Sequence, residues 1–134
     1  MWTHAFEVRT GDRPAVVDIT ERVNELLAGR GDGLLHVFLP HATAGLALIE
    51  TASGSEPDLL ERLEALLPRD APYRHTHGAA SHGRDHLLPA LMPPALVLAV
   101  RGGRLDMGVW QSLVVVDTNG DNPIREVRLS LLAG

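Results

Sequence analysis

The sequence predicts an α+β fold in which two main helices accompany a largely antiparallel, sandwich-like sheet. Roughly seven or eight apolar segments have strand length, two segments have helical periodicity, and strands both precede and follow the helices. The chain has no Walker loop and no Gly-x-Gly-x-x-Gly motif after a strand, which disfavours a doubly wound nucleotide-binding fold. Since no linker divides the 134 residues, we expect one domain over residues 1–134.

The N-terminal part of the chain predicts two strands followed by a helix. Residues 2–10 roughly alternate polar and apolar side chains before a Gly-Asp turn, and residues 14–20 resume as a short strand. Asp18 then precedes Glu21 by three positions, which is the spacing of a capping box. Apolar residues at helical spacing follow, so we expect a helix over residues 21–30.

The middle of the chain predicts two further strands and the clearest helix. Residues 34–40 and 45–50 are short and apolar, and the break between them carries the motif HATAG. Residues 55–68 place five leucines along one helical stripe, with Ser55 able to cap the start and Pro68 ending the helix.

The C-terminal part predicts strands separated by glycine-containing turns. Residues 86–94 are interrupted by prolines and favour a short helix or turn. Strands are expected over residues 95–100, 103–117 and 125–132. The last two are joined by TNGDNP, in which Asn-Gly is a strong turn signal.

Composition excludes several classes of protein. The net charge of -5, without a dense basic cluster, argues against a nucleic-acid partner. The absence of cysteine excludes disulfides, thiolate nucleophiles and cysteine-ligated zinc, so a metal site would use His, Asp, Glu and water. The N-terminal residues do not resemble a signal peptide, and the longest apolar run, ALVLAV, is too short to cross a bilayer. We therefore expect a cytoplasmic protein with no membrane partner.

Residues 72–86, PYRHTHGAASHGRDH, contain four of the seven histidines. His75 and His77 face the same side of an extended backbone, whereas His82 and His86 share one face if their segment is helical. Three neutral imidazoles around an open coordination position suit Zn²⁺ or a similar divalent ion. The alternative is a polar loop with solvated histidines, and spacing alone leaves both interpretations open.

Other residues offer weaker signals for a functional site. His41 follows a strand beside small residues that let a ligand approach the backbone, and the Thr43 hydroxyl can donate to a carboxylate or phosphate oxygen. The alternative is a turn with a surface histidine. Trp110 fits a core or interface position as well as a ligand platform. Asp85 and Asp106 are able to orient a histidine tautomer, although surface carboxylates are common.

The segments HATAGLALIE, YRH, DHLLPALMPPALVLAV and GRLDMGVWQ, taken in order, resemble the YjbQ family over nearly the whole chain. The positions that match the family pattern are His41, Thr43, Ala44, Glu50, Tyr73, His75, His86, Gly108, Trp110 and Gln111. The positions that depart from it are Ala42, Ile49, His82 and Val109.

The resemblance implies a homotrimeric α+β sandwich with a histidine-lined pocket near a subunit interface, and a thiamine-phosphate synthase-like activity. On this hypothesis a divalent metal ion such as zinc is bound by His41, His75 and His86. His41 and Glu50 take catalytic roles, and the residues expected to bind a phosphorylated small-molecule substrate are Thr43, Tyr73, Trp110 and Gln111. Two alternatives are a non-enzymatic trimer that binds an anion or phosphometabolite, and a metal-dependent hydrolase. The roles of His77 and His82 stay open.

Overall fold

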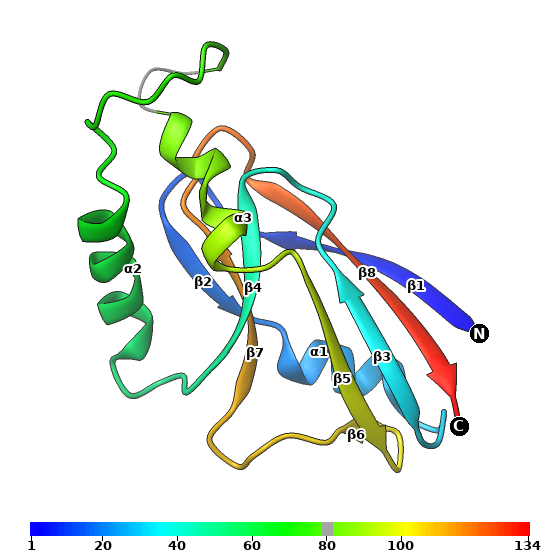
Figure 1. The fold of residues 1–134 in the computed structure, drawn as a ribbon. Helices are drawn as coiled ribbons and strands as arrows, with labels where there is room; N and C mark the ends of the chain where they lie inside the picture. Colours follow the sequence, from blue (N-terminus) through cyan, green and yellow to red (C-terminus); the bar gives the residue numbers. More distant parts are fainter. Residues whose placement is uncertain (79–81) are drawn as a thin grey trace.

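The protein is built around two antiparallel sheets (Figure 1), in a computed structural model that describes residues 1–78 and 82–134. Its strands are β1 (Trp2–Arg9), β2 (Ala15–Asp18), β3 (Gly33–Phe38), β4 (Ala44–Ile49), β5 (Ala95–Arg101), β6 (Arg104–Leu105), β7 (Ser112–Asp117) and β8 (Ile124–Ala133). One sheet has the order β1-β8-β3-β5-β6 and the other the order β2-β7-β4. Every strand pair is antiparallel, which confirms the predicted fold class.

The helices begin where the sequence predicts, but their N-terminal contacts differ from the expected caps. α1 (Thr20–Leu27) has no side-chain cap, and the Asp18 carboxylate instead accepts a hydrogen bond from the Thr20 N–H at 2.9 Å. α2 (Ser55–Leu66) starts at Ser55 itself, after Gly54 in a left-handed conformation. The 3₁₀ helix η1 (Gly83–His86) leads into α3 (Leu88–Leu91). None of the helices in the described residues is long and apolar enough to cross a membrane.

The segment 103–117, expected as one strand, is divided in the structure. β6 pairs with only two residues of β5, and residues 106–111 form a loop before β7. In that loop the Gln111 side-chain oxygen accepts a hydrogen bond from the Gly108 N–H at 2.8 Å. The polar turn-forming residues therefore interrupt the apolar pattern that the sequence presents as continuous.

The main core lies between the two sheets and α1, and β7 is buried on both faces. Leu113 and Val115 belong to the main core, whereas Val114 and Val116 face a second core beneath α2. A strand buried on both sides needs apolar residues at every position, which explains the uninterrupted LVVV sequence. α2 contributes its buried Leu63 to the second core and so covers the outer face of the smaller sheet.

A buried ion pair ties the end of β7 to β8 and to the start of β4. Arg125 donates to both carboxylate oxygens of Asp117, at 2.7 and 3.0 Å, and to the Thr43 hydroxyl at 2.9 Å. Both charged side chains are about 1% exposed, so the two-pronged geometry compensates the cost of burying the charges. This network fixes the end of the molecule at which the histidine-rich segment lies.

Candidate metal centre

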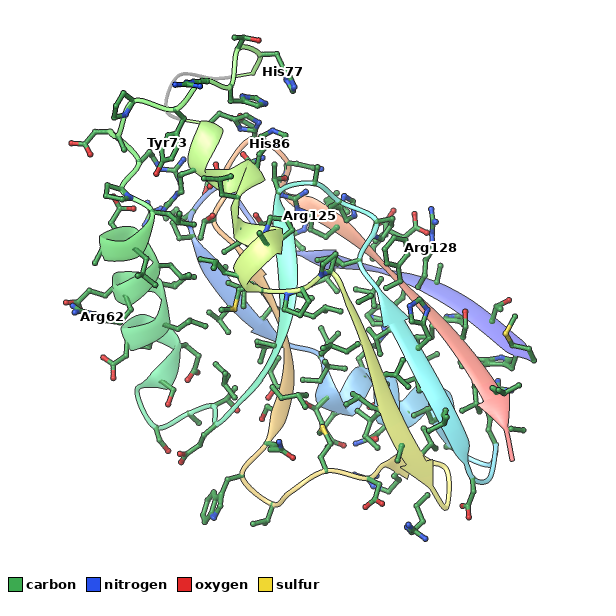
Figure 2. All side chains as sticks on the ribbon, in the orientation of Figure 1. Arg62, Tyr73, His77, His86, Arg125 and Arg128 are labelled. Atoms are coloured by element: carbon green, nitrogen blue, oxygen red, sulfur yellow. The ribbon has the colours of Figure 1, made fainter. Side chains whose placement is uncertain are left out.

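The histidine-rich segment lies at one end of the molecule, beside the turn between β7 and β8 (Figure 2). After α2 the chain runs without regular structure through His75, and it re-forms as η1 and α3. His82 immediately precedes η1 and His86 is its last residue. The two side chains meet across this turn, as the sequence suggested for a helical segment, although the turn is 3₁₀ and not α-helical.

Three imidazoles converge in this segment. One ring nitrogen from each of His75, His82 and His86 lies within 4.8 Å of the others. The Nε2 atoms of His82 and His86 are 2.7 Å apart, and the rings of His75 and His86 stack with their centroids 4.0 Å apart. His77 lies at the edge of this group, with its Nε2 3.1 Å from that of His75. Ring nitrogens that face one another suit a shared proton or a shared cation.

Burial and crowding lower the pKa of two of these imidazoles and so favour their neutral forms. Partial burial lowers the pKa of His75, and the imidazoles of His77 and His82 lower it further. Burial also lowers the pKa of His86, with additional lowering by the other three rings and partial opposition by Asp85. Because only a neutral imidazole offers a lone pair to a metal ion, these shifts favour the ligating form.

A buried carboxylate holds η1 in place beneath the histidines. Asp85 is about 1% exposed and accepts hydrogen bonds from the Thr118 hydroxyl at 2.7 Å and from Arg69 at 3.1 and 3.4 Å. Arg84, also buried, lies 3.1 Å from Asp85 and 2.8 Å from Glu64 of α2. Arg69 further donates to the Thr118 carbonyl at 2.7 Å. The histidine-bearing turn is thus anchored both to α2 and to the end of β7.

Gly83 allows the two halves of the segment to approach each other. A Cβ atom at this position would lie 2.6 Å from Cβ of Tyr73 and 3.3 Å from Cβ of His75. The Tyr73 hydroxyl in turn donates to the Pro68 carbonyl at 2.7 Å. Tyr73, expected to bind substrate, therefore has a structural contact that fixes the chain leading to His75.

His41 and Thr43 lie at the start of β4, and His41 is outside the group of three. Among the described residues, the ring nitrogens of His75 and His86 cluster with that of His82 and not with that of His41. Nε2 of His41 accepts a hydrogen bond from the Glu126 N–H at 2.8 Å, and burial together with Arg125 lowers its pKa. The Thr43 hydroxyl is buried against Arg125, so it contacts the ion pair and not an open pocket.

Glu50, Trp110 and Gln111 lie at the opposite end of the sheet from the histidines. Ile49, just before Glu50, pairs with Ser112 at the start of β7, whereas Asp85 contacts Thr118 beyond the end of β7. A strand rises about 3.3 Å per residue, so roughly 20 Å separates the two ends. Within one chain these three residues therefore do not join the imidazoles.

The sequence offers Asp85 and Asp106 as carboxylates that could orient a histidine, and in the structure Asp85 lies near a histidine whereas Asp106 does not. Asp85 lies 3.9 Å from Nδ1 of His82, whereas Asp106 pairs with Arg101 on β5 at 3.2 Å. Sequence reasoning missed Asp121, whose Oδ2 lies 3.3 Å from Nδ1 of His82. The sequence carries no signal for that contact, because 39 positions separate the two residues.

Comparison with known proteins gives consistent matches over the chain. A family model described as UPF0047 protein YjbQ-like matches residues 4–134. The UPF0047 protein Rv2556c of Mycobacterium tuberculosis is 51% identical over 134 residues, which cover all of both chains. The hypothetical protein APE1520 from Aeropyrum pernix K1 has a crystal structure with a TM-score of 0.88 and 34% identity, covering 100% of both chains.

A further solved structure supports the fold alone. The YbjQ-like protein SSO2532 from Sulfolobus solfataricus P2, described as of unknown function, has a TM-score of 0.90 and 23% identity, covering 99% of this chain and 97% of that one. The expectation of a thiamine-phosphate synthase-like activity is corrected by these findings, because the relatives are described as UPF0047, hypothetical or unknown-function proteins and none of these descriptions names such an activity. Their descriptions name neither an anion-binding role nor a hydrolase activity.

Proposed function

This chain belongs to the UPF0047 family of YjbQ-like proteins, and we propose a function for it from its own side chains. The proposal is that the protein binds one divalent transition-metal ion through His75, His82 and His86. The observation that carries it is the convergence of one ring nitrogen from each of these residues to within 4.8 Å.

The donor set selects the class of ion. Three imidazole nitrogens favour Zn²⁺ and its first-row neighbours, whereas Mg²⁺ and Ca²⁺ prefer oxygen ligands. His82 is buried, and its Nδ1 makes no hydrogen bond to any described residue. A buried histidine whose Nε2 lies 2.7 Å from Nε2 of His86, within a group of three imidazoles, fits a metal ligand better than a solvated surface residue.

Three protein ligands leave a coordination position open. His75 and His86 are only partly buried, so this position is accessible from solvent. An ion with such a vacancy takes a water molecule or another oxygen ligand and acts as a Lewis acid toward it. The chain's own contribution is to hold the histidine-bearing turn in one geometry through Asp85, Arg69 and Arg84.

The test is metal stoichiometry in protein purified without a histidine tag. After loading with Zn²⁺ and desalting, elemental analysis should find about one ion per chain in the parent and far less in His82→Ala and His86→Ala. His36→Ala is the matched control, since His36 is exposed on β3 away from the cluster and should leave the stoichiometry unchanged. A parent that holds no stoichiometric metal, or a His82→Ala protein that retains it, would refute the proposal.

A homotrimer is a second part of the proposal. Val109 and Trp110 are 89% and 73% exposed on the loop before β7, and exposed neighbouring apolar and aromatic side chains are typical of protein interfaces. Light scattering should give three times the chain mass of 14.5 kDa, and Trp110→Ser should lower that mass. A monomeric parent would contradict this part without affecting the metal proposal.

A further inference from the structure

Asp121 lies on the turn between β7 and β8, next to the buried histidine of the candidate metal centre. Its N–H donates to the Asn119 side-chain oxygen at 2.9 Å, and the Asn119 N–H donates to Asp117 at 2.9 Å. These two local bonds order the turn and place the Asp121 carboxylate beside His82, with Oδ2 3.3 Å from Nδ1. The turn is further tied to η1 by the bond between the Thr118 hydroxyl and Asp85.

Nδ1 of His82 is buried and lacks a hydrogen-bond partner among the described residues. The ring is buried, with 9% of the side chain exposed, and Nδ1 has no hydrogen bond of good geometry among the described residues. A buried polar atom without a partner is costly, so a small rotation of the Asp121 side chain into hydrogen-bonding geometry is favoured. Because Asp121 is 50% exposed at its side chain, it has the freedom to make that rotation.

Asp85, the other nearby carboxylate, is less suited to this role. Its oxygen lies farther from Nδ1 of His82, at 3.9 Å. Both of its oxygens already accept hydrogen bonds, from Arg69 and Thr118, and Arg84 lies 3.1 Å away. Asp121, in contrast, has no other ion-pair partner among the residues that the structure describes.

We propose that Asp121 is a positioning residue that holds His82 in its Nδ1–H tautomer, so that the Nε2 lone pair faces His75 and His86. The effect on metal affinity rests on the proposed metal-binding function. The tautomer of His82, in contrast, is a property of the metal-free protein as well. There Nε2 of His82 accepts a hydrogen bond from Nε2–H of His86 across 2.7 Å. An ion bound at this position would replace that hydrogen bond, and neutral His86 would change to its Nδ1–H tautomer, its single proton moving from Nε2 to Nδ1 through solvent. Carboxylates that fix a ligating histidine in this way strengthen metal affinity by roughly 10–100-fold.

The experiment compares Asp121→Ala and Asp121→Glu with the parent in two measurements. Long-range ¹H–¹⁵N NMR of the metal-free protein reports the His82 tautomer, and competition with a chromophoric chelator reports the affinity for Zn²⁺. We expect the Nδ1–H tautomer in the parent, a shift toward Nε2–H in Asp121→Ala, and retention in Asp121→Glu. The Zn²⁺ affinity should fall about 10–100-fold in Asp121→Ala.

Asp106→Asn is the charge control, since Asp106 pairs with Arg101 at the far end of β5 and its loss should change neither measurement. The inference is overturned if His82 is already the Nε2–H tautomer in the parent, or if Asp121→Ala leaves the tautomer and the affinity unchanged. Failure of the proposed function looks different. In that case the parent takes up no Zn²⁺, while the tautomer measurement still decides the role of Asp121.

Discussion

Replacing Gly83 by alanine tests whether the close approach of two chain segments builds the candidate metal centre. The backbone at Gly83 is not in the left-handed region, so the substitution adds a methyl group without backbone strain. That methyl carbon would lie 2.6 Å from Cβ of Tyr73, 3.1 Å from its Cγ and 3.3 Å from Cβ of His75. Cβ of Tyr73 is bonded directly to the backbone, so it is unable to rotate away from the new methyl group.

The size of the effect follows from these distances. Ordinary van der Waals contact begins at 3.4 Å, so Tyr73 and Gly83 have to separate by about 0.8 Å. Overpacking of this kind costs about 1–3 kcal/mol of stability. Metal–ligand distances tolerate a change of only about 0.2 Å, so a displacement of this size between His75 and the other two histidines should also weaken metal binding.

Thermal unfolding with and without Zn²⁺ tests the Gly83→Ala variant. Thermal unfolding without metal should show a lower Tm for Gly83→Ala, and the stabilisation on adding Zn²⁺ should be smaller than in the parent because weaker binding contributes less. Gly108→Ala is the control, since its new methyl would meet only the flexible end of exposed Gln111, at 3.2 Å. If Gly83→Ala matches the parent in Tm and in Zn²⁺ response, the steric account of the site is wrong.

Three further predictions concern charge. Asp85→Ala removes the buried carboxylate partner of Arg84 and leaves it only the exposed Glu64 carboxylate, so the free energy of unfolding in urea should fall by about 3–5 kcal/mol. Exposed Asp70→Ala is the comparison, and an equal effect from both would contradict the anchoring role. Asp117→Ala should cost a similar 3–5 kcal/mol, since it strands Arg125, and a loss below 1 kcal/mol would count against that ion pair. The third prediction is a pH dependence of the metal-free protein. Burial and the neighbouring imidazoles hold the pKa of His75 and of His86 below the ordinary 6.5. The unfolded chain therefore binds more protons just below pH 6.5, so stability should fall on acidification there and should not change through these groups above it. The double variant His75→Ala/His86→Ala should flatten that slope, and an unchanged slope would show that other groups cause it.

The sequence was informative where the structural signal is local. The stripe of leucines predicted α2, and the Asn-Gly turn separated β7 from β8. The histidine spacing indicated only a cluster, and the resemblance to the YjbQ family selected His75 and His86 from it as candidate ligands. The sequence was misleading at residues 103–117, because the strand-like pattern continues across the loop of residues 106–111. In that loop the Gln111 side chain accepts a hydrogen bond from the Gly108 N–H. The resemblance to the YjbQ family was correct about family and fold and wrong about a thiamine-phosphate synthase-like activity.

Outside residues 103–117, periodicity, proline and glycine determined by themselves which segments of this chain become strands and helices, because such preferences act over one or two turns of backbone. Only the tertiary structure decided which distant side chains meet. Antiparallel pairing along β7 carries Glu50 and Trp110 to one end and the histidines to the other. The packing of η1 against the turn after β7 brings Asp121 to His82 across 39 positions. Strand order and register follow from burying two cores at once, and no short stretch of sequence records that requirement.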